Sequence, residues 1–394
     1  MTAAAAPISE TDRSSLAVTL AVTVVASMPV FLTGALGVEV RRDLGVSVTE
    51  LGAAVSACFG ISGLASNFAG RLSRQLGPRQ TLRVSTLVTG SSMLGLATVG
   101  RSFPALVVCL GICGIGHSLT QPAVNALLIR RVAIRRLGLA FGVRQSAIPV
   151  VVLLSGISVP ALALTIGWRA VFGVAAAFAV GTSIFAGTLD ETARPGATIQ
   201  RSGTLATRRN LVVLGVAGGL GAMAGNALAV FLVSAAAHAG IGQGAAGLLL
   251  AVASLTAVLA RIVMGDLADR RQAEGLGIVA ILLAVGSLGF LGLTSSVPAL
   301  FVVASLLAFA AGWGWPGLFS FAIVIRHPHA PEVATATTQS GMYLGAACGP
   351  VIFGALATLS YGVAWTVMAS ALLAAALITL AARSALAPPP ARPA

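Results

Sequence analysis

The sequence contains no lysine and few charged residues of any kind, which limits the classes of protein it can belong to. Charged residues make up 9% of the 394 positions, whereas a soluble globular domain carries about 25%. Hydrophobic residues make up 57%, and the mean hydropathy is +0.96. Such a chain cannot cover itself with a surface suited to water. We therefore expect it to lie in a lipid bilayer.

Cysteine is also scarce. The four cysteines, Cys58, Cys109, Cys113 and Cys348, all fall within apolar stretches. A secreted, disulfide-stabilised domain would carry them in loops and more densely, so we expect reduced packing residues. The lack of lysine excludes the ATP-binding loop Gly-x4-Gly-Lys-Ser/Thr. The sequence thus predicts no cofactor and no ATP bound through such a loop.

Arginine supplies all 24 basic residues and gives a net charge of +13, but its distribution does not suit nucleic acid. Short arginine clusters lie between apolar stretches, and no basic patch with interleaved aromatic residues is present. Counted over alternate loops, one side takes 18 arginines and the other takes four. By the positive-inside rule the first side is cytoplasmic. We therefore expect a multi-pass protein of a bacterial inner membrane, with both termini in the cytoplasm and no nucleic-acid partner.

Twelve apolar stretches are long enough to cross a bilayer as helices. They are Leu16–Val38, Val48–Gly70, Thr81–Gly100, Phe103–Ile129, Gly138–Ala161, Trp168–Thr188, Leu211–Ala236, Gln243–Met264, Gly275–Thr294, Val297–Ile325, Val333–Thr358 and Gly362–Ala382. The first stretch is too long for a cleaved signal peptide. The sequence predicts a cytoplasmic tail (1–15), a six-helix bundle (16–189), a cytoplasmic linker (190–210), a second six-helix bundle (211–382) and a cytoplasmic tail (383–394).

The two halves repeat each other. Three pairs of matching positions are separated by nearly the same number of residues: Gly70 and Gly265 by 195, Gln145 and Gln339 by 194, and Gly114 and Gly312 by 198. Offsets this consistent, close to half the chain length, indicate a duplicated six-helix unit.

The repeated loop resembles a signature of the major facilitator superfamily, Gly-x-Leu-x-Asp-Arg-x-Gly-Arg-Arg/Lys. The first copy matches at Gly70, Leu72, Gly77 and Arg79, and the second at Gly265, Leu267, Asp269 and Arg270. Arg74 stands where the first copy should carry an acid. The resemblance covers essentially the whole chain and implies an all-α membrane fold of twelve helices in two pseudo-symmetric bundles. It also implies that these loops latch the bundles together in one state of transport, centred on Asp269. Alternatively, the charges only end helices and fix the topology.

A second signature of the superfamily, typical of antiporting exporters, is missing from the fifth stretch. A partial copy appears in the eleventh, as Gly345-x3-Gly349-Pro350 followed by Gly354. Small residues at this spacing allow helices to approach closely, and proline permits a kink. The pattern therefore predicts close packing and does not establish antiport.

No acidic residue lies deep inside a predicted span, which argues against a buried carboxylate that binds a cation. Arg144, about six residues into the fifth stretch, is the charge placed furthest inside a span. Because no acid lies at its depth, an anionic substrate is its natural complement. The alternative is that Arg144 reaches the membrane surface or bonds loop carbonyls.

Candidate binding residues lie on both halves. The fourth stretch carries Cys109, Cys113, His117, Gln121 and Asn125 at intervals of four, along one helix face. This stripe predicts a polar cavity lining with His117 near the bilayer midplane, or hydrogen bonds between helices; a metal site would need a fourth ligand. Gln145, next to Arg144 in the sequence, is a further candidate. By analogy between the two halves, the second half should contribute cavity residues, namely Asn226, Gln339, Trp313 and Trp315. The tryptophans would either form a wall on which a substrate stacks or fill space between helices. Arg261 is expected at the membrane interface.

These observations predict a secondary transporter that moves a small organic anion or a similar metabolite by rocking of the two bundles. The runner-up is an exporter of hydrophobic drugs. A membrane-embedded enzyme would need clustered acids, histidines or metal ligands at depth, and a channel would show an oligomeric pore motif. Expected partners are the small-molecule substrate, membrane lipids and a coupling ion, either a proton or an exchanged anion. The chain is expected to be monomeric.

Overall fold

The computed structural model describes residues 10–131, 137–187, 205–270, 275–327 and 331–385. These residues form helices and loops, without a strand. The helices are α1 (Glu10–Ala35), α2 (Gly37–Leu44), α3 (Val48–Thr98), α4 (Phe103–Arg131), α5 (Leu137–Ser158), η2 (Val159–Ala163), α6 (Leu164–Ile166), α7 (Trp168–Ala186), α8 (Leu205–His238), α9 (Gln243–Arg270), α10 (Gly275–Gly292), α11 (Pro298–Leu307), η4 (Ala308–Gly312), α12 (Pro316–Arg326), α13 (Pro331–Ala357) and α14 (Tyr361–Ala385). The segments η2 and η4 are π-helical turns.

Helix α3 accounts for two of the twelve predicted crossings. Its 51 residues would extend about 75 Å at 1.5 Å per residue, more than twice the roughly 30 Å of a bilayer core. Gly77 breaks the helix with φ 75° and ψ 163°, a conformation that glycine adopts without strain, and Pro78 restarts it. Eleven described helices are long and apolar enough to span a membrane. The second arm of α3 supplies the twelfth crossing.

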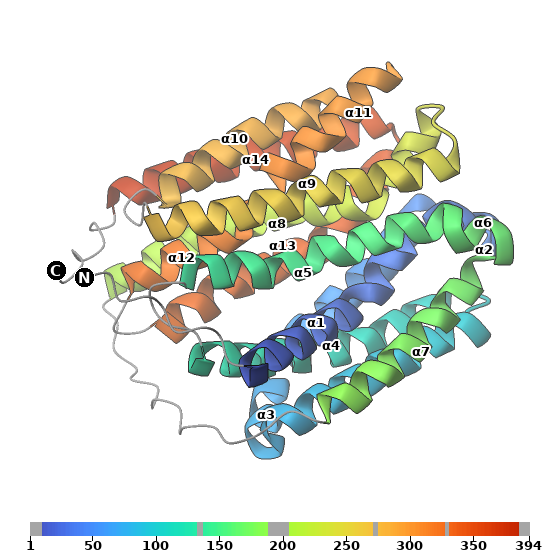
Figure 1. The fold of residues 1–394 in the computed structure, drawn as a ribbon. Helices are drawn as coiled ribbons and strands as arrows, with labels where there is room; N and C mark the ends of the chain where they lie inside the picture. Colours follow the sequence, from blue (N-terminus) through green and yellow to red (C-terminus); the bar gives the residue numbers. More distant parts are fainter. Residues whose placement is uncertain (1–9, 132–136, 188–204, 271–274, 328–330, 386–394) are drawn as a thin grey trace.

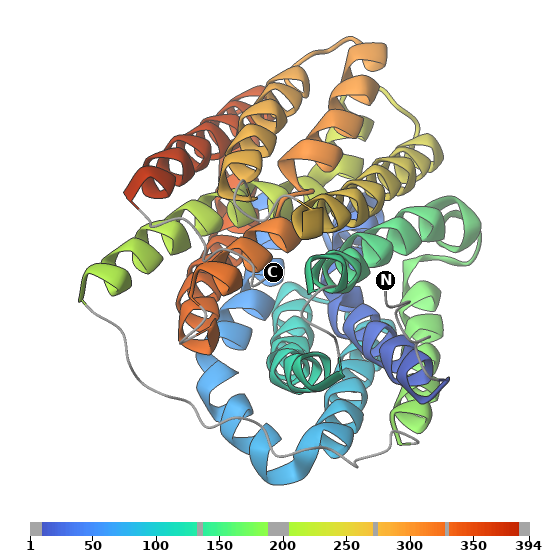
Figure 2. The same cartoon turned by 60° about the vertical axis from the view of Figure 1, so that its left-hand side comes forward.

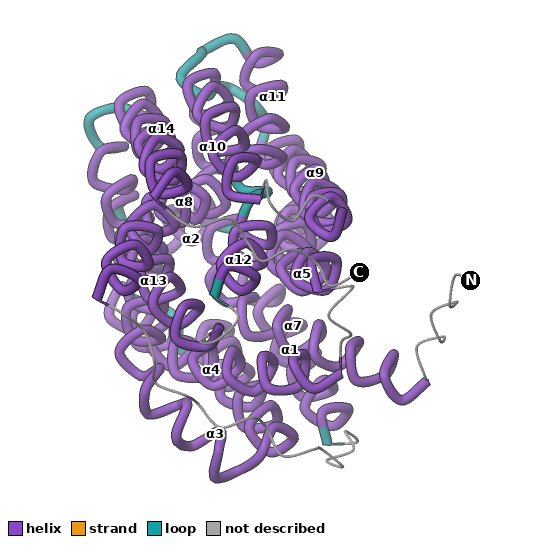
Figure 3. Tube along the Cα trace, turned by 90° about the vertical axis from the view of Figure 1, so that its left-hand side faces the viewer, coloured by secondary structure: helices purple, strands orange, loops and turns teal. Residues whose placement is uncertain are grey.

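The helices form two bundles, α1 to α7 and α8 to α14, which lie side by side as the blue-to-green and yellow-to-red halves of Figure 1. Helix α1 begins and α14 ends at the same end of the molecule, here called the N/C face, which Figure 3 views directly. The opposite end, the far face, carries α2 and the start of α7 (Figure 1). Figure 2 shows the same division from a second angle. The predicted all-α fold of two pseudo-symmetric bundles is confirmed.

Several helix ends differ from the predicted ones because polar residues continue the helices past the apolar stretches. Helix α8 begins at Leu205, inside the segment predicted as a linker, and α1 begins at Glu10. Most of the predicted linker, residues 188–204, lies outside the described residues.

Glycines let α13 lie directly against α8. A Cβ atom on Gly345 would lie 1.9 Å from the carbonyl oxygen of Gly219, and one on Gly341 would lie 2.1 Å from that of Gly215. Gly349 approaches Met223 in the same way. The close packing predicted from the small-residue spacing in the eleventh stretch is therefore present.

The two bundles meet closely near the far face. The Thr49 hydroxyl on α3 donates to the carbonyl of Gly354 on α13 at 3.1 Å, and the backbone N–H of Val351 donates to Ser56 Oγ at 3.1 Å. A Cβ atom on Gly52 would lie 2.3 Å from the Pro350 carbonyl oxygen. The first turns of α3 and the last turns of α13 therefore touch directly, with no room for a side chain at position 52; we call this contact the far-face seal.

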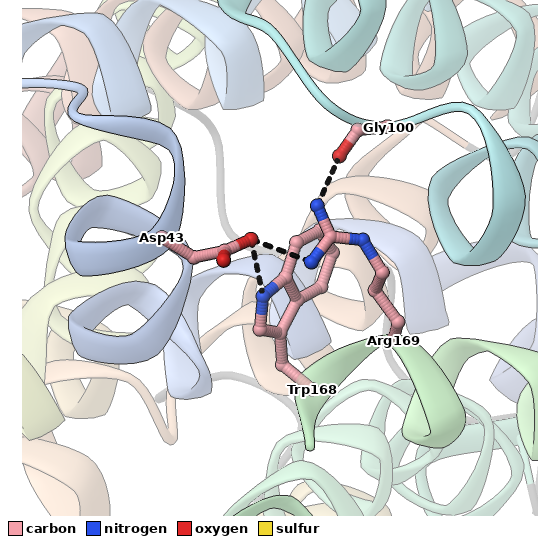
Figure 4. Close-up of polar contacts among 4 residues, drawn as sticks. All are labelled: Asp43, Gly100, Trp168 and Arg169. Atoms are coloured by element: carbon pink, nitrogen blue, oxygen red, sulfur yellow. Dashed lines mark hydrogen bonds and ion pairs between the residues drawn. The ribbon is translucent and has the colours of Figure 1, made fainter.

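A polar cluster ties the first bundle together at the same face (Figure 4). The Asp43 carboxylate on α2 accepts from Arg169 Nη1 at 2.5 Å and from the Trp168 indole N–H at 3.3 Å. Arg169 Nη2 also donates to the Gly100 carbonyl at 3.1 Å. The cluster joins α2, the turn after α3 and the start of α7, so it fixes three elements of one bundle relative to each other.

Candidate functional site

Arg144, on the second turn of α5, faces the interface between the bundles. Its side chain is half-buried and lies near Tyr343, which is close to the middle of α13 in the other bundle. The side chain of Gln339, one turn earlier on α13, lies beside the Tyr343 hydroxyl. Two helices from opposite bundles thus present an arginine, a tyrosine and a glutamine to the same region.

His117 joins this region from α4, where it occupies the middle of the helix. Its ring packs edge-on against Tyr343, with centroids 6.4 Å apart, and against Phe59 of α3 at 6.2 Å. Its Nδ1 lies 3.4 Å from the carbonyl oxygen of Ala26 on α1. We call His117, Arg144, Gln339 and Tyr343 the cross-bundle site.

Arg261, on α9, is a second arginine well inside a span, and it is only 1% exposed. Its Nη1 donates to the Gln145 carbonyl on α5, and its Nε and Nη2 donate to the Trp313 carbonyl at 3.2 and 2.8 Å. The guanidinium also lies 5.0 Å from the centre of the Trp313 ring. The expectation that Arg261 lies at the membrane interface was therefore wrong.

Breaks in the helical hydrogen-bond pattern explain why these carbonyls accept from Arg261. The Gln145 carbonyl would normally accept from the N–H of residue 149, but Pro149 has none. The Trp313 carbonyl lies where the chain leaves helical geometry before α12 starts at Pro316. An unpaired carbonyl is costly in hydrocarbon. Arg261 satisfies both carbonyls and joins the two bundles.

The tryptophans fill space at the same junction. Trp313 packs against Phe31 of α1, with ring centroids 5.9 Å apart, and against Phe309 at 5.6 Å. The indole N–H of Trp315 donates to the Gly312 carbonyl at 3.1 Å, a carbonyl that Pro316 leaves without a helical donor. Both tryptophans are buried, which supports packing between helices over a stacking wall in an open cavity.

The cysteine part of the stripe on α4 packs against α3. Cys113 lies 3.4 Å from Cys58, sulfur to sulfur, and Cys109 packs against Gly95. The described residues contain no group of three histidines, cysteines or acids placed to hold a metal ion. The side chains of Gln121 and Asn125 lie outside the described part. Asn226 donates to the Ala222 carbonyl of its own helix at 2.9 Å, and Gln145 contributes its carbonyl to Arg261.

The two loops predicted to act as latches lie at the N/C face. In the first loop, Gly77 lies at the break of α3, Leu72 is half-buried and Arg79 is exposed. Gly70 borders open space, because a Cβ atom there would have no neighbour within 4 Å. In the second, Gly265 packs against the other bundle, because a Cβ atom on Gly142 of α5 would lie 3.3 Å from its Cα. Asp269 is half-buried near the end of α9, and the Arg270 side chain lies outside the described part.

Sequence reasoning missed Tyr343. The available signal was its spacing, since Tyr343 follows Gln339 by four residues and so lies on the same face of α13. The contact with Arg144 and His117 had no local signal, because it joins residues about 200 positions apart.

Two pseudo-symmetric six-helix bundles with a polar site between them, at mid-depth, define a multi-pass secondary transporter. The Major Facilitator Superfamily profile matches residues 18–215 and 214–394, and the chain belongs to this family. A search of curated proteins gives no match.

Solved structures share the fold. One is a crystal structure of a D-xylose-proton symporter, with a TM-score of 0.72 and 17% identity over 93% of this chain and 97% of that one. Another is the human organic anion transporter MFSD10 (TETRAN), with a TM-score of 0.70 and 17% identity over 93% of this chain and 99% of that one. At such identity the likeness defines the fold alone.

Proposed function

We propose that this transporter carries a small organic anion, bound at the cross-bundle site and moved by alternating access. The observation that carries the proposal is that Arg144 on one bundle lies near Tyr343 on the other, with Gln339 beside Tyr343 on α13. A ligand held by both sides of the interface couples its binding to the relative position of the bundles.

The charge balance of the site favours an anion. Within the described residues, every acid lies either in α2 or within two turns of a helix end, away from mid-helix His117 and Tyr343. Arginine offers a planar set of donors that matches a carboxylate or phosphate, and Tyr343, Gln339 and His117 add polar contacts. A positive site of this kind attracts anions and repels cations.

The names of the structural relatives do not choose the substrate, because one is a sugar symporter and the other an organic anion transporter. The first couples transport to protons. We propose a proton or an exchanged anion as the coupling ion here.

Alternating access requires the far-face seal to open. In the proposed cycle, α3 and α13 separate at the point where Gly52 now faces the Pro350 carbonyl. When the far face is open in this way, the loop after α9, around Asp269, latches the bundles together at the N/C face. The arginine bias supports a cytoplasmic N/C face in a bacterial inner membrane, and we propose this orientation. Reporter fusions at the C-terminus and next to Gly100 test this orientation; a C-terminal reporter outside the cell would overturn it.

A ligand screen tests the substrate class. Purified wild-type protein and Arg144→Gln are melted with organic acids, sugars, amino acids and cationic drugs. Binding to the folded state raises the melting temperature. We expect organic acids to stabilise the wild type and not Arg144→Gln, while an exposed-arginine control, Arg209→Gln, behaves as wild type. Stabilisation by neutral or cationic compounds alone, unchanged in Arg144→Gln, would exclude the anion proposal.

Hydrophobic drug export is the second candidate, because aromatic rings surround the interface. Phe59 contacts His117, and Phe31 contacts Trp313 across the two bundles. In that case the same screen would show that hydrophobic drugs raise the melting temperature. Replacing the aromatic ring of Phe59 with an aliphatic side chain would then reduce this stabilisation more than Arg144→Gln does.

A further inference from the structure

A groove runs along the outside of the second bundle between α10 and α14, far from the cross-bundle site. It encloses about 370 Å³ and is lined by apolar residues along its length, with Gly277 and Arg383 at one end. Ile281 and Ala284 form the α10 wall, and Leu373 and Leu377 form the α14 wall. Nothing in the transport proposal uses this groove.

The groove has the length of one acyl chain. Arg383 and Leu373 are separated by ten residues of α14, about 15 Å at 1.5 Å per residue. This is half of the roughly 30 Å hydrocarbon core, so the groove extends from the end of the helix to about the bilayer midplane. Its apolar walls match a lipid tail.

The end of the groove at the N/C face is positively charged. Arg383, in the last turn of α14, is exposed and lies close enough to Arg326 at the end of α12 for the two charges to repel. Arg326 Nη1 donates to the Ala322 carbonyl at 3.3 Å. Among the described residues, Arg383 has no hydrogen bond or ion pair. The Arg383 guanidinium thus offers charged donors to an anion at this end of the groove.

Gly277 holds the Arg383 guanidinium at the mouth of the groove. A Cβ atom on Gly277 would lie 2.6 Å from Arg383 Nη1, so the guanidinium lies directly on the first turn of α10. That turn adds backbone N–H groups and the positive end of a helix to the charge of the arginine. Because position 277 has no side chain, the Arg383 guanidinium can lie against α10 at the charged end of the groove.

We propose that this groove is a binding site for one anionic phospholipid of the leaflet at the N/C face. Its phosphate contacts Arg383 and Arg326, and one acyl chain lies between α10 and α14 as far as Leu373. Basic pockets between transmembrane helices bind anionic headgroups by this combination of charge and apolar wall.

Native mass spectrometry of the purified chain, titrated with dioleoyl phosphatidylglycerol or dioleoyl phosphatidylcholine, tests the site. We expect the first phosphatidylglycerol to bind more tightly than phosphatidylcholine. Arg383→Gln should weaken phosphatidylglycerol binding about fivefold, the usual effect of one basic residue at a membrane surface, and leave phosphatidylcholine unchanged. Arg383→Lys should keep most of the affinity. The matched control is Arg209→Gln, an exposed arginine of the same bundle, which should have no effect.

Two further variants separate the tail from the headgroup. Ala284→Phe fills the groove and should weaken both lipids, while Gly277→Ala displaces the guanidinium and should imitate Arg383→Gln. If Arg383→Gln and Arg209→Gln lower phosphatidylglycerol binding equally, the proposal is overturned. It is also overturned if inorganic phosphate displaces the lipid while Ala284→Phe has no effect, because the site would then bind a free anion only. Each variant is first checked for a monodisperse elution profile.

Discussion

Arg144 and Arg261 are both arginines inside membrane-spanning helices, yet the structure gives them opposite surroundings. Arg261 is 1% exposed, and backbone carbonyls from both bundles accept its hydrogen bonds. Arg144 is half-buried and faces polar side chains of the other bundle. The Trp313 carbonyl belongs to the same bundle as Arg261 and stays beside it, whereas partners on the other bundle shift when the bundles move. We therefore expect the first arginine to support structure, and we propose that the second meets a ligand.

The largest expected effect is on folding, from Arg261→Met. This change keeps much of the side-chain volume but leaves the Gln145 and Trp313 carbonyls without their donor. Each buried carbonyl left unpaired costs about 1–3 kcal/mol. We expect a large loss of folded protein and a lower melting temperature, measured by fluorescence-detected size exclusion in detergent. Arg261→Lys should be intermediate, because one ammonium group cannot reach both carbonyls as a planar guanidinium does.

Arg144→Gln is the matched substitution at the other arginine, and here we expect transport to fail while the protein stays folded. Loss of one partner of a desolvated charge pair costs about 2–5 kcal/mol of binding. Uptake of the organic anion found in the screen, measured in proteoliposomes, should nearly vanish, and Arg144→Lys should retain part of it. Equal melting temperatures for Arg144→Gln and Arg261→Met would remove the distinction between the two arginines.

His117→Ala and Gln339→Ala test the neighbours of Arg144. Each removes a polar contact of the cross-bundle site, so each should weaken substrate binding by about 1–3 kcal/mol. The expected readout is a higher KM for the anion with less change in the melting temperature. A full loss of transport in Asn226→Ala, whose side chain bonds its own helix, would show that the site has been placed wrongly.

The smallest effect is expected at a third arginine. Arg169 pairs with Asp43 at the far face, where the side chains are 33% and 45% exposed. Exposed ion pairs contribute about 0–1 kcal/mol because water and salt screen them. Asp43→Asn should lower the melting temperature slightly, less so at high salt, and leave transport intact. If Asp43→Asn lowered the melting temperature as much as Arg261→Met, burial would not determine how much an arginine contributes to the stability of this protein.

The sequence predicted much of the fold because the signals for it are local. The apolar stretches and the glycine spacing of the eleventh stretch depend only on residues near each other in the chain. The break of α3 at Gly77 falls between the second and third predicted stretches. The predicted helix ends were less accurate, as at Leu205, because hydropathy does not report where a helix continues into polar surroundings.

The candidate site was predicted only in part. Arg144, His117 and Gln339 were identified as polar residues inside apolar stretches. Tyr343 was missed, and Arg261 was placed at the membrane surface, since its two carbonyl partners lie 116 and 52 positions away. Pro149, which frees the Gln145 carbonyl, is visible in the sequence, but the donor that reaches this carbonyl is not.

Composition and periodicity alone determined that this protein is helical, spans a membrane and is built from a duplicated unit, because the bilayer requires apolar length and internally satisfied backbone groups. Tertiary structure decided which polar residues join backbone segments and which face side chains of the other bundle. The same residue type, arginine in an apolar helix, occurs in both situations. Only the partners brought to it by the other bundle distinguish the two.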